Sequence, residues 1–188
     1  NANAEKILML DDDLRFAARI NAEEPVRLRP ATQGDVDHAL REAKKKLSTL
    51  AHVGISARQG NNRHAHGWIP NNRCVYALGY RPAVVRRVCE LGRIETREDM
   101  DYTLQLLRNG LPNAVLTTLA VDQKYNAPGG ASEERSMERS NADAERLAEL
   151  HKGLVKVVEK NYSTSIPRKE VICYWKRAYE QGAKWRNN

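Results

Sequence analysis

Apolar residues recur every three or four positions over three stretches of the chain, 35–51, 96–110 and 167–181. This spacing places them on one face of a helix. In the second stretch, a carboxylate three residues after Thr96 is typical of a capping box, in which a hydroxyl and a carboxylate bind the first free N–H groups. The pattern therefore predicts three amphipathic helices.

A longer periodic stretch covers residues 133–160. Its spacing is close to a heptad and predicts one long helix. The helix would pack on the protein's own helices or form a homodimer seam, and His151 on its stripe is expected to be a hydrogen-bonded core residue. The stripe consists of Met137, Ala144, Leu147, His151, Leu154 and Val158.

Two short helices are predicted in succession at 69–92. Pro70 suits the start of the first and Gly79 its end, because glycine adopts the left-handed conformation without steric cost. Pro82 fits the first turn of the second helix, and Gly92 closes it. The outline is that of a helix-turn-helix.

The remaining segments are less regular. We expect a helix over 12–21, capped by one of three consecutive aspartates, which could alternatively bind a divalent cation. Residues 25–30 lie between prolines and suggest a connector or edge strand. The glycines and asparagines of 54–67 indicate a loop, and 111–125 fits a buried helix or strand equally well.

Together these elements predict a mainly α protein, a single helical domain of six or seven helices with at most short strands. A helical core would occupy residues 1–125, with the helix-turn-helix-like pair at 69–92. Residues 126–132, which contain Pro-Gly-Gly, would form a loop or linker. Residues 133–188 would then supply two C-terminal helices packed on the core.

Composition narrows the class of protein. No apolar run approaches 18 residues and no signal peptide is readable, so we expect a cytoplasmic protein without a membrane span. Three cysteines, at positions 74, 89 and 173, form no CxxC pair. This favours reduced thiols over a disulfide framework or a four-thiolate zinc site.

The net charge of +7 is concentrated in two segments. Residues 58–97 carry eight arginines against two acidic residues, and 163–188 carry six basic against two acidic residues. Arginine suits phosphate because its planar head offers several donors. We therefore predict a nucleic-acid-binding regulatory or accessory module, whose candidate contacts are Arg73, Arg81, Arg86, Arg87, Lys169, Lys176 and Arg177.

Two alternatives stay open. The 133–160 helix could make the chain a protein-interaction or assembly module. His64 and His66 are spaced for metal binding in an extended loop, with Cys74, Cys89 or His52 to complete a set, which would suit a metal-dependent enzyme. No nucleophile motif and no phosphate-binding glycine loop is present. The sequence therefore predicts no cofactor and favours a binding module over an enzyme.

Overall fold

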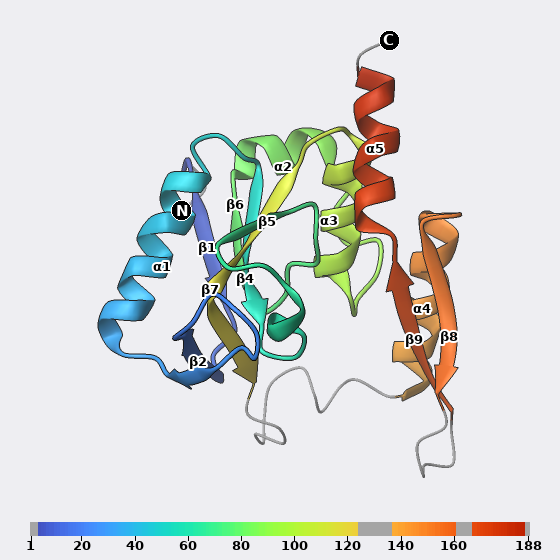
Figure 1. The fold of residues 1–188 in the computed structure, drawn as a ribbon. Helices are drawn as coiled ribbons and strands as arrows, with labels where there is room; N and C mark the ends of the chain where they lie inside the picture. The colour runs from blue at the N-terminus through green and yellow to red at the C-terminus, as the bar shows by residue number, and fades with distance from the viewer. Residues whose placement is uncertain (1–3, 124–136, 161–166, 187–188) are drawn as a thin grey trace.

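The computed structural model describes residues 4–123, 137–160 and 167–186. Within these ranges the chain forms five α-helices and nine β-strands (Figure 1). The prediction of a mainly α protein is therefore wrong, because a seven-stranded mixed sheet forms the centre of the molecule.

The order of the sheet is β1-β6-β4-β7-β2-β3, and β5 also pairs with β7. Only β4 and β7 pair in parallel. Since β1 is antiparallel to β6, and β6 to β4, the strands β1, β4 and β7 all end at the same edge. The strands are β1 (Ile7–Leu10), β2 (Leu14–Arg19), β3 (Leu28–Pro30), β4 (His52–Ala57), β5 (Trp68–Pro70), β6 (Ala77–Tyr80) and β7 (Asn113–Gln123).

Helices cover both faces of this sheet. On one face, α1 (Gln33–Lys46) packs Ala43 together with Leu47 against Val53 of β4. On the other face, α2 (Pro82–Val88) and α3 (Glu98–Arg108) pack against Tyr80 of β6. The strict alternation of side chains along β4 and β6 supplies an apolar surface to each layer.

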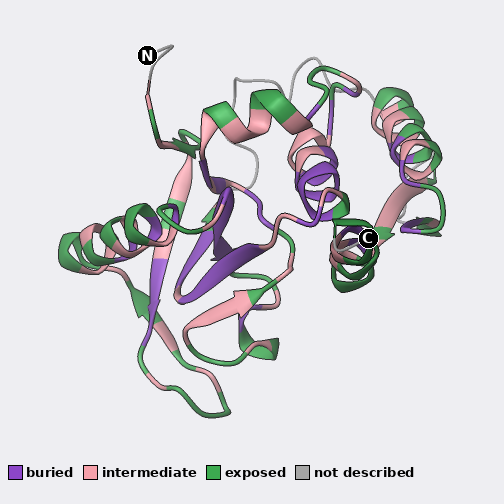
Figure 2. Cartoon of the chain, turned by 90° about the horizontal axis from the view of Figure 1, so that it is seen from above, coloured by how far each residue is buried: buried purple, intermediate pink, exposed green. Residues whose placement is uncertain are grey.

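A further layer lies outside α3 and is built from the C-terminal part of the chain. It contains α4 (Met137–Leu150), the hairpin of β8 (Val155–Lys160) with β9 (Arg168–Cys173), and α5 (Trp175–Arg186). Leu104 and Leu107 of α3 pack against this layer, whereas Leu106 faces the sheet. Helix α3 is therefore buried on nearly every side, as Figure 2 shows.

Several predicted elements are confirmed. The helices expected at 35–51 and 96–110 correspond to α1 and α3, and the edge strand expected at 25–30 is β3. Thr32 caps α1 in a capping box with Asp35. The undecided segment 111–125 contains the central strand β7, and 126–132 lies outside the described residues.

The helix-turn-helix prediction is wrong in its first half. Strands β5 and β6 occupy the place of the first helix, and only α2 forms, without a buried residue. Gly79 does not end a helix. It lies in β6, where a Cβ atom would come within 2.8 Å of Val53 Cγ2, so glycine is needed for close packing beside β4.

The long helix predicted at 133–160 is also wrong. Helix α4 ends at Leu150, and Gly153, with φ of 78°, turns the chain into β8. Ala144, Leu147, His151 and Leu154 are still buried as the stripe predicted, but within the chain itself and across a turn. A homodimer seam at 133–160 stays a prediction.

Three further predictions are wrong because the segments contain strands. Residues 12–21 contain β2 rather than a helix, the loop at 54–67 begins with buried residues of β4, and 167–181 divides into β9 and α5. Along β4 nearly every residue is buried, because both faces of the strand are covered, and this hides the strand alternation. No helix within the described residues is long and apolar enough to cross a membrane.

Candidate active site

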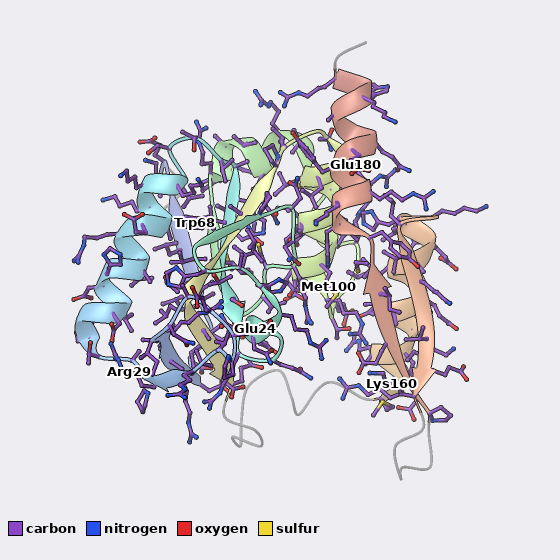
Figure 3. The ribbon with its side chains drawn as sticks, viewed as in Figure 1. Glu24, Arg29, Trp68, Met100, Lys160 and Glu180 are labelled. Carbon is purple, nitrogen blue, oxygen red and sulfur yellow. The ribbon has the colours of Figure 1, made fainter. Side chains whose placement is uncertain are left out.

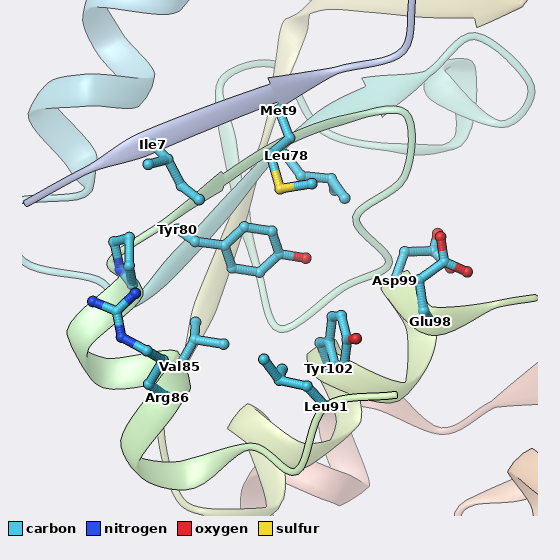
Figure 4. A pocket seen from close by; sticks show the side chains of 11 residues that line it. Ile7, Met9, Leu78, Tyr80, Val85, Arg86, Leu91, Glu98, Asp99 and Tyr102 are labelled. Atoms are coloured by element: carbon cyan, nitrogen blue, oxygen red, sulfur yellow. The ribbon is translucent and has the colours of Figure 1, made fainter. Parts of the chain in front are cut away.

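A cavity of about 250 Å³ lies beside the edge strand β1, on the face of the sheet that α2 and α3 cover (Figure 4). Most of its wall is apolar, as is typical of ligand sites, and a few polar groups converge on it. It is lined by Ile7, Met9, Leu78, Tyr80, Pro82, Val85, Arg86, Leu91, Glu98, Asp99 and Tyr102.

Asp99 is one of two carboxylate residues that line this cavity, the other being Glu98. It lies in the first turn of α3, and its Oδ1 accepts the backbone N–H of Met100 at 2.8 Å. Burial raises the pKa of Asp99 to about 6, although the guanidinium of Arg73 acts in the opposite direction. A carboxyl group that titrates near neutral pH in a cavity is a candidate acid–base catalyst.

Tyr80 brings a hydroxyl group into the same cavity. Its ring stacks on His52, with centroids 4.3 Å apart, and Figure 4 shows its hydroxyl pointing into the cavity. That buried hydroxyl has no hydrogen-bond partner within the described part of the chain. Because burial also raises its pKa, it stays protonated and can donate a hydrogen bond to a ligand.

His52 holds the Tyr80 ring in place by stacking against it. It is completely buried, its Nδ1–H donates to the Gly79 carbonyl at 2.9 Å, and its Nε2 accepts the Thr103 hydroxyl at 3.1 Å. This arrangement leaves the imidazole neutral, and burial lowers its pKa to about 4. Strand β4 is thereby joined to α3 directly behind the cavity.

The loop between β5 and β6 carries Arg73 to the side of Asp99. Asn71 and Tyr76 have φ of 49° and 64°, and the side chain of Asn113 holds the loop by accepting from the Asn72 N–H at 2.9 Å. The Tyr76 carbonyl in turn accepts the backbone N–H of Asp11 at 3.1 Å. The loop thus runs from Asn113, the first residue of β7, to Asp11, which follows the end of β1, and carries Arg73 beside Asp99 on the way.

The structure separates the seven predicted contact residues. Arg86 lines the cavity, while Arg81 precedes α2 and Arg87 is exposed on it. Arg73 lies beside Asp99, Lys176 and Arg177 begin α5, and Lys169 pairs with Glu145. They thus come from the loop before β6, from α2 and the residue before it, and from β9 and α5.

Sequence reasoning missed Asp99 as a site residue because Thr96 and its following carboxylates read as a capping box. Thr96 instead donates its backbone N–H to Asp143 Oδ2 at 2.6 Å and its hydroxyl to the same atom at 2.7 Å. Arg97, with φ of 68°, precedes α3 without any side-chain cap. The available signal was an acidic pair in the first turn of a helix whose residues are mostly buried.

The metal site centred on His64 and His66 is not supported. The described ranges contain no group of three His, Cys, Asp or Glu side chains that could hold a metal ion. Burial, with Arg19 and Arg63 beside it, lowers the pKa of His64, and both ring nitrogens of His52 are already bonded. Among the described residues the two loop histidines therefore have no partners for metal binding.

An apolar cavity that holds a carboxyl group titrating near neutral pH, at the edge of a mixed α/β sheet, has the features of an enzyme active site. Residues 2–130 match the family model described as TET-Associated Glycosyltransferase, so the chain belongs to that family. Neither curated proteins nor solved structures gave a match.

This family membership overturns the functional prediction. A glycosyltransferase family does not support a nucleic-acid-binding regulatory module, and β5 and β6 remove the helix-turn-helix on which that prediction rested. The metal-dependent enzyme is not supported either, and the assembly alternative loses the continuous 133–160 helix on which it rested. The arginine count misled because arginines of 58–97 also serve the fold, as the buried pair of Arg93 with Asp101 illustrates.

Proposed function

We propose that the chain transfers a glycosyl group to an acceptor hydroxyl, with Asp99 as the general base. The observation that carries this proposal is the raised pKa of Asp99 in an apolar cavity of a glycosyltransferase family member. A base with a pKa near 6 is ionised at neutral pH and still basic enough to take a proton in the transition state.

The bond changes follow from this placement. Asp99 takes the proton of the acceptor hydroxyl while the acceptor oxygen forms a bond to the anomeric carbon. The bond between that carbon and the leaving group breaks, and the leaving group departs with the electron pair. Arg86, across the cavity from Asp99 in Figure 4, offers a cation for the negative charge that develops there.

Tyr80 and the apolar wall would orient the substrate. The Tyr80 hydroxyl has no hydrogen-bond partner among the described residues and can donate to a sugar or acceptor oxygen. Leu78 and Val85 exclude water from one side, which strengthens the electrostatic effect of Asp99 and limits transfer to water.

The test is a transfer assay with a panel of nucleoside diphosphate sugars and hydroxyl acceptors, scored by release of the nucleoside diphosphate. Asp99→Asn should lower kcat by at least about 100-fold, since it removes the base. Asp12→Asn is the matched control, because it removes an exposed carboxylate outside the cavity and leaves Asp99 in place. Wild-type turnover retained by Asp99→Asn would refute this role of Asp99, and a wild-type protein inactive with the whole panel would refute the function.

A further inference from the structure

Strand β1 forms one edge of the central sheet and carries apolar side chains on both of its faces. Within the described ranges its one strand partner is β6. Ile7 and Met9 point toward the cavity of Asp99 (Figure 4), whereas Leu8 and Leu10 line a small hollow on the side of α1. Apolar residues on both faces are typical of a strand inside a covered sheet rather than at its edge.

Three of these four side chains are nonetheless exposed. The exposed fraction is 39% for Leu8, 54% for Met9 and 45% for Leu10. Since Met9 belongs to the wall of the cavity of Asp99, this wall faces solvent at the edge of the sheet. Neighbouring apolar side chains that are exposed together mark a contact surface.

The backbone of β1 also offers hydrogen-bonding groups at this edge. The N–H of Asp11 donates to the Tyr76 carbonyl at 3.1 Å and continues the antiparallel register of β1 with β6. In such a ladder every second residue directs both its N–H and its C=O to the same neighbouring strand. Positions 7, 9 and 11 therefore bond β6, and the backbone groups of Leu8 and Leu10 point away from the sheet.

The opposite edge of the sheet is protected in a way that β1 is not. Strand β3 has three residues, carries the charged Arg29 (Figure 3) and ends with Pro30. A short strand, a charge and a proline are the devices by which edge strands avoid pairing with other chains. Residues 7–10 contain neither a charge nor a proline. The sequence of β1 is therefore that of a strand paired on both sides.

A second copy of the chain fits this edge because β1 is complementary to itself. About a two-fold axis at Met9, Leu8 of each copy pairs with Leu10 of the other through their outward backbone groups. Apolar side chains then meet on both faces of the paired strands. The antiparallel direction also brings Lys6 of each copy toward the aspartates at 11–13 of the other. A shift of the pairing by two residues would instead set Leu10 opposite Lys6.

We propose that the chain forms a two-fold homodimer through β1, which joins the two central sheets into one. The axis is perpendicular to the joined sheet, so the two cavities of Asp99 lie on the same face, one on each side of the axis. Met9 of the second copy covers Met9 and completes the exposed wall of each cavity. This inference needs no step of the proposed transfer reaction, and it adds a residue of the second copy to the site.

The first experiment is analytical ultracentrifugation of the full chain over a series of concentrations. We expect twice the mass of one chain, with dissociation on dilution. Met9→Lys should raise the dissociation constant at least ten-fold, because it sets two like charges opposite each other at the axis. Ile20→Lys is the matched control and should leave the constant unchanged, since Ile20 is 55% exposed but lies outside β1. A monomeric wild type, or equal weakening by the two variants, would overturn the proposal.

Cysteine variants test the register of the two strands. Directly opposite residues of a non-hydrogen-bonded antiparallel pair have Cα atoms about 4.5 Å apart, within disulfide range, whereas diagonal neighbours lie about 7 to 8 Å apart. The background is Cys173→Ser, because the two other cysteines are buried. Met9→Cys should form an intermolecular disulfide under mild oxidation, seen by non-reducing gel electrophoresis, and Leu8→Cys should not. A disulfide in Leu8→Cys instead, or in neither variant, would overturn this pairing even for a protein with the mass of a dimer.

Discussion

His151 Nε2 lies 2.7 Å from Asp101 Oδ1, and both side chains are completely buried between α3 and the end of α4. The carboxylate also accepts from Arg93 Nε at 3.1 Å and from Gln105 Nε2 at 2.9 Å. Arg108 lies 3.3 Å from His151 Nδ1, which fits a neutral ring that donates from Nε2 and accepts at Nδ1. The pair thereby connects α3, which covers one face of the sheet, to the end of α4 in the C-terminal layer.

Removing one member of this pair leaves the other buried without a partner. We expect His151→Ala to lower the free energy of unfolding by about 3 kcal/mol, as is typical for broken buried charge networks. Lys152→Ala, at the exposed neighbouring position, should change it by less than about 0.5 kcal/mol. Urea denaturation measures both, and a His151→Ala variant as stable as Lys152→Ala would contradict the role of the pair.

Acid should weaken the same network. Burial raises the pKa of Asp101, but the hydrogen bonds from His151 and Arg93 outweigh burial and hold the pKa below its ordinary value. A lowered carboxyl pKa contributes stability above the unfolded-state pKa that is lost as pH falls through the folded-state value. In Asp101→Asn, stability measured by denaturation should therefore depend less on pH below about 4 than in the wild type.

Asp99 should show the opposite pH dependence. Its pKa is raised to about 6, so folding favours the protonated carboxyl, and the stability it contributes is lost as pH rises through 6. Asp99→Asn should therefore be more stable than the wild type at pH 8 by about 1 to 2 kcal/mol, after allowance for partial exposure, and equally stable at pH 4. Denaturation of the two proteins at both pH values measures this, and an equal difference at the two would contradict it.

From the lowered pKa of His52 we expect a loss of stability on acidification. Its pKa is lowered to about 4, below the ordinary value of 6.5, so protonation favours the unfolded chain between these values. Stability should be complete above pH 6.5 and fall toward pH 4 by up to about 3 kcal/mol. His52→Gln should reduce this slope, whereas His38→Gln, at an exposed position of α1, should keep it. A slope unchanged in His52→Gln would assign the effect to other groups.

An element can be predicted from the sequence where only one of its faces is buried. Helix α1 has alternating buried and exposed faces and a local cap at Thr32, so its pattern and its ends are both readable. Helix α3 is recognisable from its length and its closing Gly110. The strands β4, β6 and β7 are buried on both sides, so their residues show no period, and glycines 54 and 79 looked like loop or cap residues.

The active-site cavity was not predictable for a different reason. Tyr80, Asp99 and Met9 come from three separate elements, and no spacing along the chain relates them. The burial that raises the pKa of Asp99 is not revealed by the sequence alone. The sequence shows an excess of arginine over acidic residues in 58–97. It does not show whether each arginine faces solvent, a carboxylate or a cavity, because that depends on the fold.

Gly182 of α5 touches the end of α3, and this contact provides the last prediction. A Cβ atom at this position would lie 2.5 Å from the backbone nitrogen of Gly110, which itself has φ of 67°. Alanine normally favours an α-helix over glycine by about 1 kcal/mol. Here the backbone contact cannot yield without separating α5 from α3, so Gly182→Ala should destabilise the protein by about 1 to 3 kcal/mol despite the gain in helix propensity. Gln181→Ala, at the exposed neighbouring position, should be neutral or slightly stabilising, and thermal unfolding of both variants compares the two effects. A Gly182→Ala protein more stable than the wild type would show that α5 does not approach α3 as closely as described.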